Sequence, residues 1–378
     1  MTNSVRLGDV CTVVSGSTPK SNIPEYWDGN IKWITPAELT DDSYIISDSV
    51  RHITELGVYK TGLKPFPEGT VILSSRAPIG KTAIAGCEMY CNQGFKNLIC
   101  SARVNNRYLY WFLTCNTDYL NSLGRGAIFK EISKSIVEDI EIPLPHLNEQ
   151  LEVADKFEKI SSLISIRKQQ LAKLDELVKA RFVELFGDPV ASENKRKLSE
   201  IGRIFTGNTP SMKEPSYYES NDIPFIKPSD LNESGVTNIE GVEAYISEKA
   251  RPVARIIPPN SILVTCIGTI GKIGITSRES CCNQQINFVV PNDGINSLYL
   301  AYCLTFFKST LQNIANAPVV PIINKTQFSE LEVPVFDIDK QNQFAAFVEQ
   351  TDKSKLAIQQ SLGKLETLKK SLMQKYFG

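Results

Sequence analysis

The side chains best suited to bind a ligand gather in two short stretches of this 378-residue chain. The first stretch holds Arg76, Lys81, Asn92, Gln93 and Lys96, and the second holds Lys272, Asn283, Gln284, Gln285 and Asn287. Side-chain amides match the edge of adenine, guanidinium groups match the edge of guanine, and cations neutralise phosphates. The composition of both stretches therefore predicts a surface that reads nucleic acid.

Other cations and hydroxyls extend this predicted surface. Thr18, Lys20, Lys32 and Lys227 are candidate phosphate contacts, and Arg125, Lys130 and Lys325 lie in polar connections of similar type. A structural interpretation stays open for each residue taken alone. Asn92 and Asn283 are equally well explained as buried turn amides, and the lysines as solvated surface.

A nucleotide-binding loop is the first catalytic alternative. Residues 75–82, SRAPIGKT, approach the pattern of glycine, four residues, then Gly-Lys-Ser/Thr. Ser75 stands where the first glycine is needed, and the second copy has Cys266 there and Ile273 after the lysine. The pattern therefore predicts a strand that ends in a tight turn and presents Lys81 and Lys272.

Other catalytic and metal-binding motifs are missing from the sequence. An adenine methyltransferase needs an Asn/Asp-Pro-Pro-aromatic loop, which Pro258-Pro259-Asn260 does not match. The only histidines, His52 and His146, have no cysteine cluster nearby, and no clustered carboxylates have the spacing of a nuclease. We therefore expect no catalysis, no metal and no cofactor in this chain.

The chain repeats itself at an offset of 191 residues. Gly16-Ser17-Thr18-Pro19 matches Gly207-Asn208-Thr209-Pro210, and Cys91-Asn92-Gln93 matches Cys282-Asn283-Gln284. Many such matches at one offset indicate an internal duplication. Each repeat begins with a globular part and ends with a long segment free of proline.

These long segments are predicted helices, Asn148–Phe186 and Asp339–Phe377. Asn148 and Asp339 are candidate N-caps, and Gly187 is a candidate left-handed C-cap. The first helix has an apolar seam with a seven-residue repeat, and the second has an apolar stripe at three- and four-residue steps. The seam residues are Phe157, Ile160, Ile164, Leu171, Leu174, Val178 and Leu185, and the stripe residues are Ile358, Leu362, Leu365, Leu368 and Leu372.

The globular parts read as mixed α and β structure. Short apolar runs at 70–73, 82–85, 98–100 and 140–142 predict strands, and 108–120 predicts a helix. The expected fold class is α+β, with two similar mixed α/β domains separated by two long antiparallel coiled-coil helices. The predicted division is 1–147, 148–187, 188–338 and 339–378.

Bulk properties are those of an ordinary soluble chain. The net charge is −1, so any nucleic-acid surface must concentrate its cations on one face. The sequence has no apolar run long enough to span a membrane and no signal peptide at its start. With nine cysteines besides, we expect a cytoplasmic protein and no membrane partner.

The doubled arrangement resembles the specificity (S) subunit of type I restriction–modification systems over the whole chain. The residues that carry it are Leu7-Gly8-Asp9 with Gly16-Ser17-Thr18-Pro19, Leu198-Ser199-Glu200 with Gly207-Asn208-Thr209-Pro210, the Ile-Pro-Leu-Pro at 142–145, the Val-Pro-Val at 333–335, and the helix openings Asn148-Glu149-Gln150 and Asp339-Lys340-Gln341.

The resemblance implies a non-catalytic subunit whose two target recognition domains each read one half of a bipartite site in double-stranded DNA. It implies two methyltransferase (M) subunits, which carry S-adenosylmethionine, and two restriction (R) subunits that can join them. An alternative is a protein-interaction scaffold with a coiled-coil rod and two end domains. The repeats diverge most at 40–65 against 232–258 and at 115–130 against 306–321, where differences in readout are expected.

Overall fold

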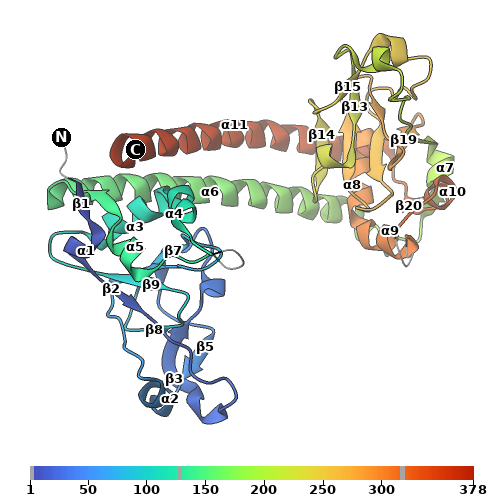
Figure 1. Cartoon of the computed structure of the whole chain (residues 1–378). Helices are drawn as coiled ribbons and strands as arrows, with labels where there is room; N and C mark the ends of the chain where they lie inside the picture. The colour runs from blue at the N-terminus through green and yellow to red at the C-terminus, as the bar shows by residue number, and fades with distance from the viewer. Residues whose placement is uncertain (1–3, 127–129, 316–319) are drawn as a thin grey trace. The chain divides into compact units, whose positions relative to one another are not determined.

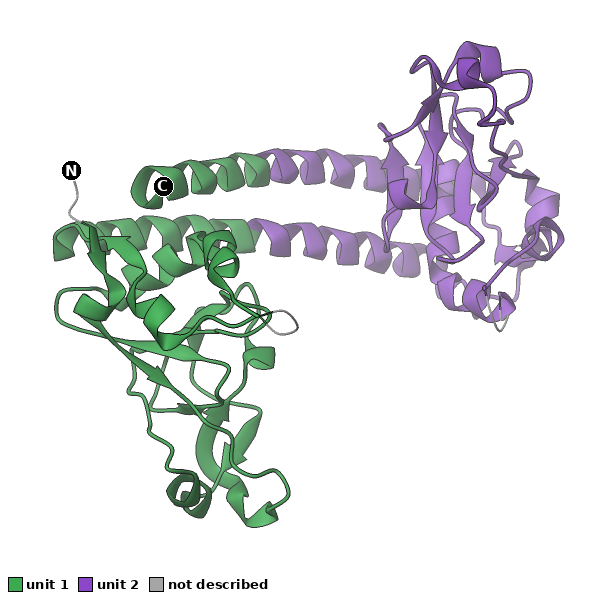
Figure 2. Ribbon diagram, viewed as in Figure 1, with its two compact units in different colours: residues 1–166, 361–378 green, residues 167–360 purple. Residues whose placement is uncertain are grey.

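The computed structural model describes residues 4–126, 130–315 and 320–378 (Figure 1). The chain divides into two compact units (Figure 2). Unit 1 comprises residues 1–166 and 361–378, and unit 2 comprises residues 167–360. Each unit therefore contains one globular part together with a portion of both long helices.

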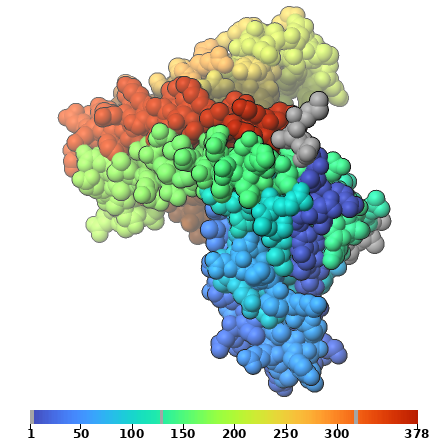
Figure 3. Space-filling model, turned by 90° about the vertical axis from the view of Figure 1, so that its left-hand side faces the viewer, coloured from blue at the N-terminus to red at the C-terminus, as the bar shows by residue number. Residues whose placement is uncertain are grey.

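The globular part of unit 1 is built mainly of short strands. They are β1 (Ser4–Arg6), β2 (Cys11–Ser15), β3 (Trp27–Ile34), β4 (Ile45–Ile46), β5 (Arg51–Ile53), β6 (Val71–Leu73), β7 (Thr82–Ala85), β8 (Tyr90–Cys91), β9 (Lys96–Cys100) and β10 (Glu141–Pro143). Its helices are α1 (Leu7–Val10), η1 (Pro24–Tyr26), η2 (Pro36–Glu38), α2 (Glu55–Thr61), α3 (Asn106–Cys115), α4 (Thr117–Leu123) and α5 (Lys134–Glu138). In the space-filling view these residues form one continuous mass (Figure 3).

The globular part of unit 2 repeats this order. Its strands are β11 (Lys195–Lys197), β12 (Gly202–Thr206), β13 (Ile223–Ile226), β14 (Val236–Ile239), β15 (Tyr245–Ile246), β16 (Ile262–Thr265), β17 (Ile273–Thr276), β18 (Cys281–Cys282), β19 (Ile286–Pro291) and β20 (Glu332–Pro334). Its helices are α7 (Leu198–Ile201), η3 (Pro215–Tyr218), η4 (Pro228–Asp230), η5 (Glu248–Ala250), α8 (Ser297–Phe306), α9 (Lys308–Ile314) and α10 (Lys325–Ser329).

The sheets of the two units have the same topology. Unit 1 has a five-stranded sheet in the order β2-β9-β6-β7-β4, and unit 2 has β12-β19-β16-β17-β14. Three-stranded sheets β5-β3-β8 and β15-β13-β18, and two-stranded pairs β1-β10 and β11-β20, complete each unit. The duplication seen in the sequence is therefore a duplication of topology, and the α+β fold class is confirmed.

The predicted helix at 108–120 is confirmed as helical structure, but it is divided into α3 and α4. The run 108–120 is not continuous, because the chain leaves helical geometry at Asn116, where φ is −109° and ψ is 26°. The Asn116 side chain donates to the carbonyl oxygen of Phe112 over 2.8 Å, which satisfies the end of α3. The predicted strands at 70–73, 82–85, 98–100 and 140–142 overlap β6, β7, β9 and β10.

The long helices are α6 (Leu147–Phe186) and α11 (Ile338–Phe377), each 40 residues. Both begin one residue earlier than expected, so Asn148 and Asp339 lie in the first turn instead of at the cap. The predicted left-handed C-cap is confirmed, because Gly187 has φ +73° and its N–H donates to the carbonyl oxygen of Val183 over 2.8 Å. Leu368 of the predicted apolar stripe is 48% exposed.

Helix pairing is visible within unit 2. Lys355 of α11 forms an ion pair of 2.7 Å with Asp175 of α6. Phe344 lies eleven residues before Lys355 on α11, and it packs on Phe182, which lies seven residues after Asp175 on α6. The contacts advance along one helix as they recede along the other, so the two helix portions run antiparallel in this unit, as expected.

Each core joins its globular part to these helices. In unit 1 the Phe157 ring of α6 stacks on Trp111 of α3 at 5.4 Å and on Phe377 of α11 at 5.5 Å. In unit 2 the Phe182 ring of α6 makes equivalent contacts, with Tyr299 of α8 and Phe344 of α11. Helix α6 thus contributes a buried aromatic side chain to the core of each unit, and only Phe157 belongs to the predicted seam.

Two buried glutamines also tie the helices to the domains. Gln150 accepts from the N–H of Asn105 over 2.8 Å and donates to the carbonyl of Pro145 over 2.9 Å. Gln341 makes the equivalent bonds with Asn296 and Phe336. Because these amides are fully buried and satisfied, they fix where each helix leaves its domain.

In the described part of the chain, no helix has the length and apolar character needed to span a bilayer.

Candidate nucleic-acid interface

Four backbone segments of unit 1 meet beside the ends of the strands. The N–H of Ser17 donates to the carbonyl of Cys91 over 3.0 Å, that of Ser75 to Gly94 over 2.8 Å, and that of Ile132 to Ser75 over 2.9 Å. These bonds join the loop after β2, the turn between β8 and β9, the end of β6 and the segment before α5. We call this arrangement the turn cluster.

Unit 2 contains the same turn cluster. The N–H of Gly207 donates to Ile286 over 2.9 Å, that of Cys266 to Gln285 over 2.7 Å, and that of Ile323 to Cys266 over 2.8 Å. The glycines are needed here for close approach. A Cβ atom on Gly16 would lie 1.9 Å from the carbonyl oxygen of Cys91, and one on Gly207 would lie 2.3 Å from that of Asn283.

A threonine holds an exposed glutamine in each cluster. The Thr18 hydroxyl donates to Oε1 of Gln93, and the Thr209 hydroxyl donates to Oε1 of Gln284 over 2.7 Å. The amide nitrogen of each glutamine has no partner among the described residues. Each cluster therefore presents a fixed amide donor at its surface.

The asparagines beside these glutamines shape the turns. Asn92 accepts from the N–H of Gly94 over 2.9 Å, and Asn283 accepts from the N–H of Gln285 over 3.1 Å. The Asn283 amide also donates to the Gln285 side chain over 2.9 Å. These contacts match the turn role of the structural interpretation, although both asparagines are half-buried instead of buried. They leave Gln93 and Gln284 as the outward-facing amides.

An ionic group completes the cluster of unit 1. The Arg76 Nε donates to Glu131 over 2.9 Å, and Lys96 Nζ donates to the other oxygen of Glu131 over 3.2 Å. Partial burial raises the pKa of the Glu131 carboxyl, but the bonds from Arg76 and Lys96 outweigh it, so its pKa lies below the ordinary value. The terminal nitrogens of Arg76 keep no partner among the described residues, and its side chain is 45% exposed.

Unit 2 replaces these charges with apolar and neutral side chains. At the offset of 191, Arg76, Lys96 and Glu131 correspond to Ile267, Asn287 and Ile322. The backbone is the same, because Arg76 pairs with Glu131 and Ile267 pairs with Ile322 in isolated antiparallel bridges. The two units therefore carry different chemistry on one scaffold.

Lys96 is buried, and three other predicted lysines lie away from solvent or are held by other groups. Lys81 donates to the carbonyl of Leu39 over 2.7 Å, and Lys272, 10% exposed, pairs with Glu233 over 2.7 Å. Lys32 donates to the carbonyl of Ser47 over 2.6 Å. The prediction that the turn presents Lys81 and Lys272 is wrong, because both side chains fold back toward the loops after β3 and β13.

The remaining predicted residues differ in their surroundings. Arg125 and Lys130 border the unit 1 cluster, because Arg125 exchanges two backbone hydrogen bonds of 3.0 Å with Glu131 and Lys130 precedes Glu131. Lys20 and Lys325 are exposed, and Lys325 lies 5.7 Å over the ring of Phe205. Lys227 is half-buried. Of the divergent stretches, 127–129 and 316–319 lie outside the described residues.

Sequence reasoning missed Thr209, Glu131, Ile267 and Ile322 as site residues. Thr209 could have been predicted, because it matches Thr18 at the offset of 191 residues. Glu131 lies 55 residues after Arg76, so local patterns do not join them. Ile267 and Ile322 carry no polar signal, and only the pairing of their backbones reveals that they face each other.

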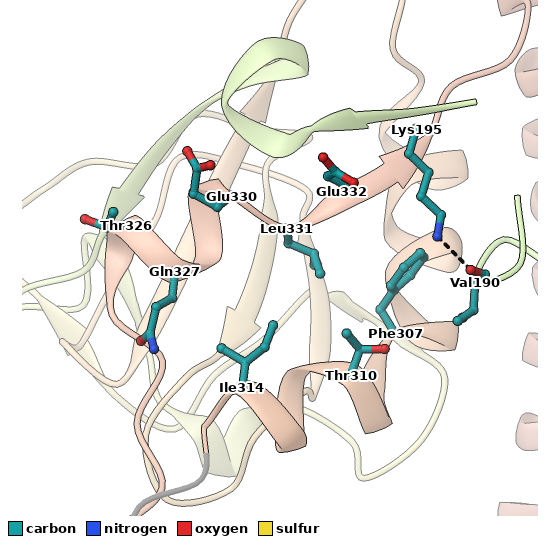
Figure 4. Close-up of a pocket in the computed structure, with 10 residues that line it drawn as sticks. All are labelled: Val190, Lys195, Phe307, Thr310, Ile314, Thr326, Gln327, Glu330, Leu331 and Glu332. Atoms are coloured by element: carbon teal, nitrogen blue, oxygen red, sulfur yellow. Dashed lines mark hydrogen bonds between the residues drawn. The ribbon is translucent and has the colours of Figure 1, made fainter. Parts of the chain in front are cut away.

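A separate pocket of about 550 Å³ opens on unit 2 and contains none of the predicted residues (Figure 4). Its apolar floor is Phe307, Ile314 and Leu331, and Lys195 at its edge donates to the carbonyl of Val190 over 2.6 Å.

Among the described residues no group of three or more His, Cys, Asp or Glu is placed to hold a metal ion.

Curated relatives share the sequence pattern. The MjaIX specificity subunit of Methanocaldococcus jannaschii, a type I restriction enzyme subunit, is 35% identical over 243 residues, which are 59% of this chain and 56% of the relative. The HindI specificity subunit of Haemophilus influenzae is 32% identical over 47% of this chain and 41% of the relative. The chain thus matches about half the length of these relatives. The MjaVIII subunit matches 98% of the chain at 23% identity.

Solved structures share the fold. The S subunit of a type I restriction–modification system from M. genitalium has a TM-score of 0.59 at 16% identity, covering 100% of this chain and 96% of its own. A chain from a study of assembly and conformational transition in a type I system has a TM-score of 0.61 at 19% identity, covering 99% and 97%. The family model described as "Type I restriction modification DNA specificity domain" matches residues 2–176 and 191–370, once in each repeat. The chain therefore belongs to the family of type I restriction–modification DNA specificity proteins.

Proposed function

We propose that this chain is a non-catalytic specificity subunit that recognises a bipartite site in double-stranded DNA, one half-site per recognition domain. The observation that supports this most directly is the turn cluster, which occurs once in each unit with an exposed glutamine fixed by a threonine. In both units the fixed amide suits a base edge, and the exposed cations beside the unit 1 cluster, Arg125 and Lys130, suit phosphates.

The partners follow from the same proposal. Two methyltransferase subunits bind the chain and carry S-adenosylmethionine, two restriction subunits can join them, and this chain holds no cofactor of its own. The complex works in the cytoplasm. The relatives are named as specificity subunits of type I restriction enzymes, which supports this division of labour.

Salt dependence tests whether the chain binds DNA at all. We expect the affinity of the full chain, assembled with its methyltransferase subunits, to fall linearly in a plot of log affinity against log salt concentration. Six to ten phosphate contacts correspond to a loss of about 10³- to 10⁵-fold between 50 and 200 mM salt. Fluorescence anisotropy with a labelled duplex measures this.

The control uses a matched pair of variants. Arg125→Ala, at the border of the cluster, should reduce the slope by about one, while Arg103→Ala, an exposed arginine outside it, should not. A protein-interaction scaffold would show no binding, or binding that salt does not change.

A further inference from the structure

The internal repeat allows the two recognition domains to be compared position by position. Features present in both turn clusters, such as the Thr18–Gln93 and Thr209–Gln284 pairs, cannot make the two half-sites different. Features that differ between the clusters on the same backbone can make the two half-sites different. The largest such difference replaces the Arg76–Glu131–Lys96 ion group with Ile267, Ile322 and Asn287.

The two isoleucines form one exposed apolar surface. The N–H of Gly268 donates to Pro321 over 3.1 Å and that of Ile323 to Cys266 over 2.8 Å, so the Ile267–Ile322 pair lies between these bonds. Residues opposed in this way have their side chains on the same face and close together. Ile322 is 47% exposed and Ile267 is half-buried.

Asn287, which replaces Lys96 in the second unit, is engaged away from solvent. Asn287 is buried, accepts from Thr206 over 2.7 Å and donates to the carbonyl of Ile323 over 3.4 Å. The isoleucines themselves offer no donor or acceptor. They suit neither a phosphate nor the polar edge of a base, because each of those would lose hydrogen bonds to water without replacement.

We propose that Ile267 and Ile322 contact the 5-methyl group of a thymine in the half-site of the second domain, at the place where Arg76, positioned by Glu131, contacts a guanine in the other half-site. The thymine methyl is the apolar group that base pairs present in the major groove, and a two-nitrogen guanidinium edge fits guanine O6 and N7. This inference rests on the proposed function.

The test couples one protein side chain to one DNA methyl group. The full chain with its methyltransferase subunits is bound to a duplex selected from random sequences for tight binding. Each thymidine of that duplex is then replaced in turn by deoxyuridine, which pairs identically but lacks the 5-methyl group. We expect one position at which this replacement weakens binding about fourfold, the effect of one buried methyl group.

The matched protein change should abolish that effect. Ile322→Ala should bind the thymidine duplex about as weakly as the parent binds the deoxyuridine duplex, and should no longer distinguish the two duplexes. Ile322→Val, which keeps a branched side chain, should retain most of the discrimination. Because Ile322 is exposed, both variants should melt like the parent, and thermal unfolding checks this.

The outcomes separate two failures. If specific binding persists but no thymidine gives a loss that depends on residue 322, the inference is overturned. If Ile322→Ala weakens binding of the methyltransferase subunits instead, the isoleucines are a protein contact and the inference is again overturned. If the chain shows no sequence-selective binding at all, the proposed function itself fails.

Discussion

The Phe182→Ala variant is expected to lose about 3–5 kcal/mol of unfolding free energy, the range for removing a large aromatic side chain from a core. Phe182 is fully buried. Its ring lies within 5.6 Å of four others, those of Phe186, Tyr299, Phe306 and Phe344. These rings come from α6, α8 and α11, so the cavity would open where the helices join the domain of unit 2.

The neighbouring residue supplies the control. Val183 follows Phe182 on α6 but is 44% exposed, so Val183→Ala should change the free energy of unfolding by less than about 1 kcal/mol. Urea unfolding followed by far-UV circular dichroism measures both variants. Equal losses for the two would show that the α6 face bearing Phe182 is not the buried face.

Changing Arg76 to alanine is expected to weaken discrimination at one half-site by about 1–3 kcal/mol, or about 5- to 150-fold. Its terminal nitrogens have no partner among the described residues, while Glu131 holds Nε over 2.9 Å. Discrimination at the other half-site should not change, because the second cluster has Ile267 at the equivalent position.

The measurement compares binding to duplexes mutated in one half at a time. Arg103→Ala removes the same charge outside the cluster and should leave discrimination unchanged at both halves. Glu131→Gln should retain part of the parent's discrimination at this half-site, because a glutamine oxygen can still accept a hydrogen bond from Arg76 Nε. Equal effects of Arg76→Ala on both halves would contradict the assignment of one domain to one half-site.

The helices and the repeat were readable from the sequence because their signals are local or periodic. Proline and glycine bound both long segments, so the ends of α6 and α11 were placed within one residue. The offset of 191 residues predicted that both globular parts share a topology, and their sheets have the same strand order. The break at Asn116 was missed, because an asparagine is tolerated within a helix and only the observed geometry shows that it ends α3.

The candidate site was only partly readable, because side chains find partners that are distant in sequence. Lys81 and Lys272 looked available, yet the carbonyl of Leu39 and the carboxylate of Glu233 hold them. Arg76 acquires a positioning partner 55 residues away. The isoleucine pair was invisible to a search for polar groups, although comparing the repeats residue by residue would have flagged positions 267 and 322.

The proposed function requires two domains of one chain to read two halves of one DNA site. The decisive experiment selects bound sequences from a pool of random duplexes with the full chain and its methyltransferase subunits, and then sequences them. We predict two short specified blocks separated by an unspecified spacer of fixed length. A single contiguous block, or no enriched sequence, would mean that the two domains do not read separate half-sites.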